Sequence, residues 1–290
     1  MPLTFHHPTS LMAACELLAE LDDAHLIAGG VSLSLMVREG FVETDHLVGL
    51  GRVDGLGEMA RVDGALVLGA RVTHDRLAHS ESVREVIGCA PRVFGGIGNS
   101  RVRNAGTLGG NLAHADPAQD PPLLLAAARA VAEVRSVRGT RDVAVAELAT
   151  GVFETALEAD EVIARVRVPV PATSRRFGYC KLTPNSHDDY GTANAAVALE
   201  STPDGSGWSL RIVVGAVVAT PFVLDVPDVD VDSLEAGLPS AVTEALATIR
   251  PQHDRKGTPA YKAALAQVAV RRAVDAALRD DASAGPRSSA

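Results

Sequence analysis

The chain has 290 residues and a formal net charge of −9 at pH 7, and 47% of its residues are hydrophobic while only 3% are aromatic. Its length allows one large domain or two smaller ones, each able to bury a core. The acidic balance and the shortage of aromatic side chains disfavour a nucleic-acid partner, because phosphates would be repelled and bases would lack stacking surfaces.

The sequence indicates neither a membrane span nor an export signal. Residues 1–4 lack the charged and apolar regions of a signal peptide, and the longest apolar run, residues 212–219, is far shorter than the roughly 18 residues that cross a bilayer. The cysteines Cys15, Cys89 and Cys180 form no Cys-x-x-Cys pair. We therefore expect a cytoplasmic protein with no disulfide framework and no iron–sulfur cluster of its own.

The first part of the chain predicts a helix, a strand and a glycine loop in succession. Thr9 or Ser10 is suited to cap an amphipathic helix, and a short apolar strand is expected over residues 25–27. The strand runs into residues 28–32 (Ala-Gly-Gly-Val-Ser), which we call the first loop, and residues 33–38 favour a helical turn or two. A glycine loop before a helix start presents free N–H groups to an anion.

The next segment alternates short strands with helices. Residues 46–50 and 65–68 are expected to form strands, and residues 73–79 and 82–93 are expected to form helices. The second of these helices leads into a glycine-rich turn over residues 95–99.

Residues 103–122 are not typical of an ordinary helix or strand. Gly106, Gly109 and Gly110 predict a backbone that takes positive φ and lets another group approach closely, and the adjacent threonine and asparagine add hydrogen-bonding side chains. We interpret this stretch as a binding loop that offers several N–H groups to one anion, and call residues 107–111 the second loop.

The remainder predicts the end of one domain and the start of another. Residues 123–128 favour a helix, and residues 130–137, 141–145 and 162–168 favour strands. Residues 169–173 contain two prolines around one residue, which cannot continue the interior of a sheet, so we expect the domain boundary there.

The second domain is expected to be a small antiparallel sheet followed by helices. Strands are predicted over residues 177–182, 195–200 and 209–218, and helices over residues 240–249 and 259–278.

Together, the two glycine loops predict a pyrophosphate-binding site, because this group carries oxygens on opposite sides. The nicotinamide fingerprint and the Walker loop are both absent, which leaves a dinucleotide bound in some other way. His114, Asp116 and Asp120 are metal-type donors, but proline turns explain both carboxylates, so no metal site is expected. Lys181 is interpreted either as a surface lysine or as a cation directed at the ligand.

The two loops give the chain a resemblance to the FAD-binding medium subunits of molybdenum hydroxylases, the family of carbon monoxide dehydrogenase and xanthine dehydrogenase. The resemblance covers nearly the whole chain, and residues 112–117 with Asp120 and residues 177–181 are further points of match. Two departures are Ala105, where relatives commonly carry arginine, and residues 183–187, which lack the basic side chains often found there and so put a nicotinamide contact in doubt.

The resemblance implies an α+β fold in three segments. Residues 1–172 would form a two-part α/β FAD-binding domain of the vanillyl-alcohol-oxidase (PCMH) type, residues 173–279 a smaller C-terminal domain of antiparallel strands and helices of the CO dehydrogenase flavoprotein type, and residues 280–290 a disordered tail. The two loops would hold the FAD diphosphate, and other residues would contact the rest of the cofactor. The expected cofactor-binding residues are Leu26, Ile27, Ala28, Gly29, Gly30, Val31, Ser32, Leu33, Ile97, Thr107, Leu108, Gly109, Gly110, Asn111, His114, Asp120, Ile163 and Lys181.

The resemblance also implies an oxidoreductase subunit without a catalytic acid or base of its own. Electrons would leave a substrate at the molybdenum cofactor of a large partner, pass through [2Fe-2S] clusters of a small partner, and reach FAD in this chain before an external acceptor. The expected complex is a dimer of heterotrimers. Two alternatives remain open: a stand-alone FAD-dependent reductase of the same fold, and a flavin-free assembly subunit.

Overall fold

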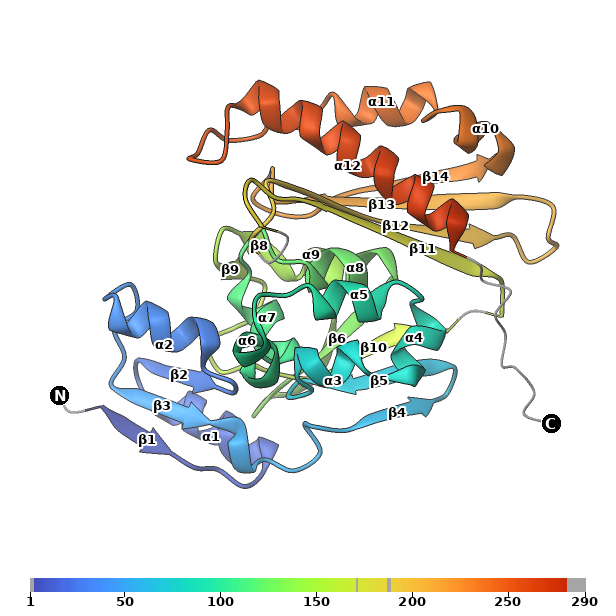
Figure 1. Ribbon diagram of the computed structural model, residues 1–290. Coiled ribbons are helices and arrows are strands. Elements are labelled where there is room, and N and C mark those ends of the chain that lie inside the picture. The colour runs from blue at the N-terminus through green and yellow to red at the C-terminus, as the bar shows by residue number, and fades with distance from the viewer. Residues whose placement is uncertain (1–2, 171, 187–188, 281–290) are drawn as a thin grey trace.

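The computed structural model describes residues 3–170, 172–186 and 189–280, which form a layered arrangement of sheets and helices. In Figure 1 a small sheet from the N-terminal segment lies at the lower left. A larger sheet with a group of short helices occupies the centre, and a third sheet, covered by the last helices, lies at the top. None of the described helices combines the length and the hydrophobicity that a membrane crossing requires.

The N-terminal segment forms a parallel three-stranded sheet that carries the first loop. Its elements are β1 (Thr4–His6), α1 (Leu11–Glu20), β2 (Ala24–Ile27), α2 (Val31–Arg38), β3 (His46–Gly49) and the 3-10 helix η1 (Leu50–Arg52). The strand order is β1-β3-β2. Ser10 caps α1 by accepting a hydrogen bond from the Ala13 amide at 3.1 Å, which confirms the predicted helix start. The parallel pairing places the first loop at the end of β2, where α2 begins.

A five-stranded antiparallel sheet forms the centre of the molecule. Its strands are β4 (Met59–Val62), β5 (Ala65–Gly69), β6 (Val131–Ser136), β7 (Gly139–Ala144) and β10 (Val162–Pro169). They lie in the order β4-β5-β10-β6-β7, so the long strand β10 joins two hairpins. Alternate apolar residues of these strands face a core that the short helices cover. The predicted strands at the positions of β5, β6, β7 and β10 are confirmed.

Short helices follow each of the two hairpins. They are α3 (His74–Ala78), α4 (Glu81–Val86), α5 (Ala90–Gly95), α6 (Ser100–Ala105), α7 (Leu108–His114), α8 (Pro121–Ala127) and α9 (Val145–Leu148), with the small hairpin β8 (Ala149–Gly151) and β9 (Glu154–Thr155). Helices α3–α8 connect the two hairpins, and α9 with the small hairpin links β7 to β10. The single helix predicted over residues 82–93 is wrong, because the chain extends at Ile87 and starts α5 afresh at Ala90. Pro91 lies in the first turn of α5, a position where the missing N–H is harmless.

The C-terminal part is an antiparallel sheet covered on its outer face by helices. It contains β11 (Arg175–Leu182), β12 (Ala193–Ser201), β13 (Trp208–Gly215), β14 (Phe222–Val229), α10 (Val231–Ala236), α11 (Ser240–Leu246) and α12 (Pro259–Arg279). The strand order is β11-β12-β13-β14, and we call this the four-stranded sheet. The three predicted strands and two predicted helices are confirmed. The edge strand β14 was not predicted, and it contains Pro227, which the edge of a sheet tolerates.

Helix α12 packs closely on the four-stranded sheet through Gly178 of β11. A Cβ atom at Gly178 would lie 1.9 Å from the Ala273 carbonyl oxygen, so glycine sets the approach of the helix to the strand. At the end of this helix, the Asp280 carboxylate accepts a hydrogen bond from the Phe177 amide at 2.9 Å. Residues 281–290, which the sequence assigns to the tail, lie outside the described residues.

Candidate functional site

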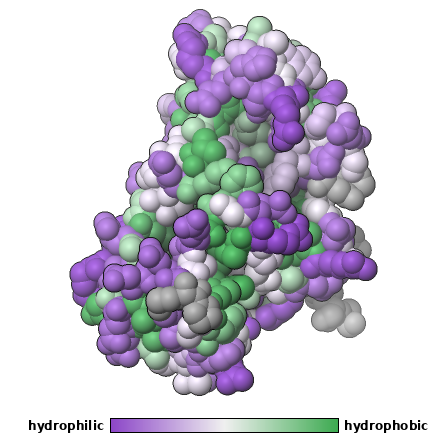
Figure 2. Space-filling view, turned by 90° about the vertical axis from the view of Figure 1, so that its left-hand side faces the viewer, coloured by the Kyte–Doolittle hydropathy of each residue, from purple (hydrophilic) through white to green (hydrophobic). Residues whose placement is uncertain are grey.

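A cavity of about 660 Å³ lies where the small parallel sheet, the short helices and the four-stranded sheet meet. This size falls in the range of small-molecule and cofactor sites, roughly 300–1,000 Å³. Its lining comes from β2 and α2, from α6 and α7 with the turn before α8, and from β10 and β11. Figure 2 shows one face of the molecule, where hydrophobic residues gather in the middle between hydrophilic ones.

The first loop forms one wall of the pocket and depends on two glycines. Gly30 precedes α2 in the left-handed conformation (φ 68°, ψ 4°), which glycine adopts without strain. Gly29 lies against the backbone of α6, since a Cβ atom there would be 1.7 Å from the Ala105 carbonyl oxygen. Glycine is therefore required here both for a turn and for a close approach.

The start of α2 presents unpaired backbone donors to the pocket. No side chain caps this helix, and the N–H groups of Val31, Ser32 and Leu33 donate no hydrogen bond to any described residue. The partial positive charge of a helix N-terminus adds to these donors. This wall is suited to bind an anion such as a diphosphate.

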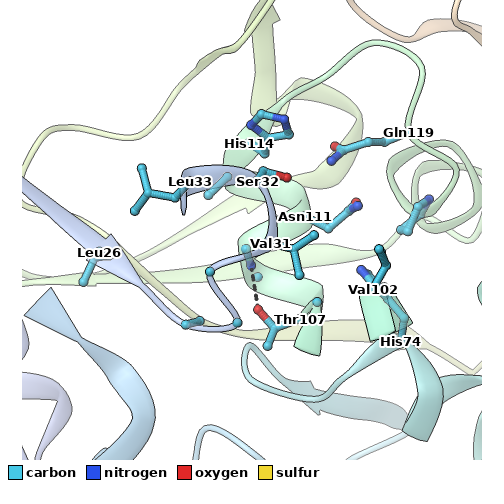
Figure 3. A pocket seen from close by; sticks show the side chains of 18 of the residues that line it. Leu26, Val31, Ser32, Leu33, His74, Val102, Thr107, Asn111, His114 and Gln119 are labelled. Carbon is cyan, nitrogen blue, oxygen red and sulfur yellow. Dashed lines mark hydrogen bonds between the residues drawn. The ribbon is translucent and has the colours of Figure 1, made fainter. Parts of the chain in front are cut away.

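The second loop forms the opposite wall and has a different construction from the one expected. It is the first turn of α7, capped by Thr107, whose hydroxyl accepts a hydrogen bond from the Gly110 amide at 3.3 Å. Figure 3 shows this bond as a dashed line. The Leu108 and Gly109 amides donate to the carbonyl oxygens of Val72 and Ala70. The expectation that this loop offers several free N–H groups is therefore wrong for these three amides.

The glycines around the second loop serve packing rather than unusual backbone angles. Gly106, Gly109 and Gly110 do not have positive φ, so that prediction was wrong. A Cβ atom at Gly109 would lie 2.6 Å from the Ala70 Cβ, so the glycine lets α7 rest directly on the chain after β5. The glycine-rich pattern thus reflects the close packing of α7 against the segment that follows β5.

Several buried polar atoms in the pocket lining have no hydrogen-bond partner among the described residues. They include Asn111 Oδ1, Gln119 Oε1, His25 Nδ1 and His74 Nδ1. Figure 3 shows Ser32, Asn111, His114 and Gln119 close together in the upper half of the view. Burial lowers the pKa of His74 to about 4, so this side chain is neutral at physiological pH. Since buried polar groups are normally hydrogen-bonded, these atoms fit a ligand that carries hydroxyl or amide groups.

A buried ion pair occupies the side of the pocket that faces the four-stranded sheet. Lys181 Nζ donates to Asp120 Oδ2 at 2.9 Å and to the Gly96 carbonyl oxygen at 3.1 Å. Tyr179 Oη and Asn194 Nδ2 donate to Asp120 Oδ1 at 2.5 and 3.2 Å. Burial raises the pKa of Asp120, and the Lys181 charge and the Tyr179 hydrogen bond oppose that rise. The cation interpretation of Lys181 is the one that fits this position.

The structure brings almost all the predicted cofactor-binding residues to this one cavity. Leu108 is the exception, because it is fully buried in the core beneath α7. Ile97, in the turn after α5, and Ile163 of β10 contribute apolar wall. The pocket also contains Gln119, His74 and Glu161, which the sequence reasoning missed. Gln119 lies within the glycine-rich stretch and was detectable from it, whereas nothing in the sequence marks the other two.

The metal-type donors of the second loop region do not converge on a metal site. Asp116 Oδ1 accepts a hydrogen bond from the Ala118 amide at 2.9 Å, and the His114 ring packs on Phe153. Among the described residues there is no group of three or more histidine, cysteine or carboxylate side chains able to hold a metal ion. The lining of the pocket suits a ligand with an anionic part, a polar part and an apolar part.

Comparisons with known proteins agree with this description. The sequence profile of the FAD binding domain in molybdopterin dehydrogenase matches residues 1–171, and that of the CO dehydrogenase flavoprotein C-terminal domain matches residues 178–277. The nicotine 6-hydroxylase medium subunit of Paenarthrobacter nicotinovorans is 34% identical over 277 residues, which covers 94% of this chain and 96% of that one. The carbon monoxide dehydrogenase medium chain of Afipia carboxidovorans is 32% identical, with the same coverage.

Solved structures show the same similarity. A chain of quinoline 2-oxidoreductase from Pseudomonas putida 86 superposes with a TM-score of 0.85 at 30% identity, covering 96% of this chain and 98% of that one. A chain of carbon monoxide dehydrogenase from Hydrogenophaga pseudoflava, in a form that lacks the molybdenum-pyranopterin moiety, gives a TM-score of 0.84 at 29% identity with the same coverage. These matches confirm the predicted α+β fold class.

Proposed function

Because the chain belongs to the FAD-binding medium subunits of molybdenum hydroxylases, we propose that it takes electrons from iron–sulfur clusters of a partner subunit and passes them through FAD to an external acceptor. The resemblance inferred from the two loops is confirmed, as are the oxidoreductase class and FAD as the cofactor of this chain. One observation carries the proposal: the unpaired N–H groups of Val31, Ser32 and Leu33 face a cavity lined by unpaired polar atoms.

The residues of the pocket fit the three chemical parts of FAD, which are the anionic diphosphate, the polar hydroxyl and ring-edge groups, and the apolar ring surface. The start of α2 would bind the diphosphate, supported from the opposite wall by Thr107 and the polar side chain of Asn111. Gln119 and the Asp120–Lys181 pair would meet hydroxyl or ring-edge groups, and Ile97 would contact an apolar surface. The bound flavin supplies the chemistry of accepting and releasing electrons. The chain orients it, and no pocket side chain is assigned the role of general acid or base.

The chain works as the medium subunit of a multi-subunit complex. We propose a large molybdopterin-binding partner and a small [2Fe-2S] partner in a dimer of heterotrimers, located in the cytoplasm. The three thiols support the location, since all are free in the structure. The domain boundary between residues 172 and 173 also remains a proposal, supported by the limits of the two profile matches.

The two alternatives differ from the proposal in the visible absorption spectrum of the purified chain and in whether its activity requires partner subunits. The purified full chain is expected to be yellow, to release FAD on denaturation, and to gain several degrees of melting temperature at about 100 times the FAD dissociation constant. A colourless chain that binds no added FAD would favour the flavin-free assembly subunit. Turnover of an organic substrate by the purified chain alone, without partner subunits, would favour the stand-alone reductase.

A further inference from the structure

Three donors from the four-stranded sheet converge on one carboxylate of the first part of the chain. Asp120 precedes α8, whereas Tyr179 and Lys181 lie on β11 and Asn194 lies on β12. Lys181 and Asn194 are direct cross-strand partners, and Tyr179 is two residues from Lys181, so all three side chains leave the same face of the sheet. This face meets the pocket at Asp120.

We propose that Tyr179 and Asn194 are positioning residues that hold the Asp120 carboxylate against Lys181 and thereby fix the Lys181 ammonium group in the FAD pocket. The inference rests on the proposed function, because it assumes that the pocket binds FAD. Asp120 and Lys181 line the cavity, whereas Tyr179 and Asn194 do not. Any influence of the latter two on the cofactor therefore passes through the ion pair.

The hydrogen bonds of Asn194 fix its orientation. Its Nδ2 donates to the Ala118 carbonyl oxygen and to Asp120 Oδ1, both at 3.2 Å, and both partners are pure acceptors when the carboxylate is ionised. The side chain is fully buried, and its Oδ1 has no partner among the described residues. An unpaired buried oxygen is unfavourable, so packing alone would select an apolar residue here. The donation to Asp120 gives the asparagine a reason to occupy this position.

The Lys181 side chain depends on the carboxylate for its position. Its ammonium group has two acceptors among the described residues, Asp120 Oδ2 and the Gly96 carbonyl oxygen, and only the first is charged. A lysine side chain loses much rotamer freedom when it is fixed, so a weakly held partner would leave it mobile. Tyr179 and Asn194 restrict Asp120 Oδ1, which leaves Oδ2 directed at the ammonium group.

The cluster predicts a pH dependence with a definite sign. The titratable groups that face Asp120 are Tyr179, Lys181 and Tyr190, and Cys89 and Cys180 face Tyr179 in turn. Burial raises the pKa of Tyr179 well above its usual value, so it remains a donor. Loss of this donor would raise the pKa of Asp120 further, and the carboxylate would then be protonated, and the ion pair lost, at a higher pH.

The test is the FAD dissociation constant of the full chain, measured by flavin fluorescence from pH 8 to pH 5. Tyr179→Phe is expected to weaken FAD binding about tenfold at pH 8 and to move the acid loss of affinity to higher pH. Tyr261→Phe is the matched control, because Tyr261 is exposed on α12 and does not line the pocket. Its FAD affinity should equal that of the wild type at every pH.

Two further variants separate positioning from a general loss of packing. Lys181→Met should reproduce the weaker binding, and in an Asp120→Ala background Tyr179→Phe should have no further effect, since its partner is gone. A wild-type chain that binds no FAD would overturn both the proposed function and this inference. If the wild type binds FAD and Tyr179→Phe has the same affinity and pH profile, this inference alone is overturned. It is also overturned if Tyr179→Phe weakens FAD binding by the same factor in the wild-type and Asp120→Ala backgrounds.

Discussion

The contact between Gly29 and the end of α6 gives the sharpest test of the pocket. Gly29→Ala would place a methyl carbon 1.7 Å from the Ala105 carbonyl oxygen and 2.6 Å from its carbonyl carbon. Ordinary contacts between heavy atoms lie at about 3.5 Å, so the first loop would have to move away by roughly 2 Å. Both sides of the contact are backbone, which leaves no side chain to rotate out of the way.

The expected loss of affinity follows from the donors that the first loop provides. A hydrogen bond to a charged group contributes about 1.5–3 kcal/mol, and a shift of this size would break at least two of those from Val31, Ser32 and Leu33. The total of roughly 3–6 kcal/mol corresponds to a dissociation constant for FAD that is about 10² to 10⁴ times higher. The fold should survive, because the first loop lies at the pocket wall.

The assay is titration of FAD into the full apoprotein, with circular dichroism as a check of folding. Gly51→Ala is the matched control, since a Cβ atom there meets nothing within 4 Å and the residue does not have positive φ. The control should bind FAD as the wild type does. A folded Gly29→Ala chain with a dissociation constant within about threefold of the wild type would refute the reasoning.

Three further predictions concern stability. Thr107→Ala removes the cap of α7 and should lower the free energy of unfolding by about 1 kcal/mol, whereas Thr107→Ser should keep it, as urea titration would show. Gly178→Ala should cost about 1–3 kcal/mol in the same assay, because the methyl group meets the Ala273 carbonyl oxygen; an unchanged midpoint would contradict this packing. Burial lowers the pKa of His74 to about 4, below the ordinary histidine value of 6.5, so stability should fall by about 3 kcal/mol as the pH drops between these values. His74→Leu should flatten the pH dependence in that window, and an unaltered slope would argue against a buried neutral His74.

Local sequence signals predicted a helix or strand correctly where a single signal, such as a capping residue or an alternating pattern, decided the segment. Ser10 as a helix cap and the alternating strands of the two antiparallel sheets follow from such rules. The helix over residues 82–93 failed, because the pattern of apolar residues was given more weight than Pro91. Strand β14 was not predicted; it contains Pro227, which a strand tolerates at the edge of a sheet, and the edge position is set by the tertiary structure.

The predicted site residues, apart from Leu108, line one cavity, but the construction of the second loop was predicted wrongly. A run of glycines does not reveal whether the backbone needs positive φ or close packing, and for Gly109 the answer is packing against Ala70. Likewise, the partners of Asp120 come from strands more than 50 residues away, and their register fixes them. Pairing of that kind depends on the tertiary structure, which local patterns do not encode.

The division of the Asp120 cluster between two parts of the chain also bears on the order of events during synthesis. The first loop, the second loop and Asp120 leave the ribosome before β11 and β12, which carry Tyr179, Lys181 and Asn194. An N-terminal part that bound FAD early would contact it through the first loop while the side formed by Lys181 was still missing. The pocket lining is therefore complete only when the four-stranded sheet has packed against the helices, because Lys181 belongs to that sheet.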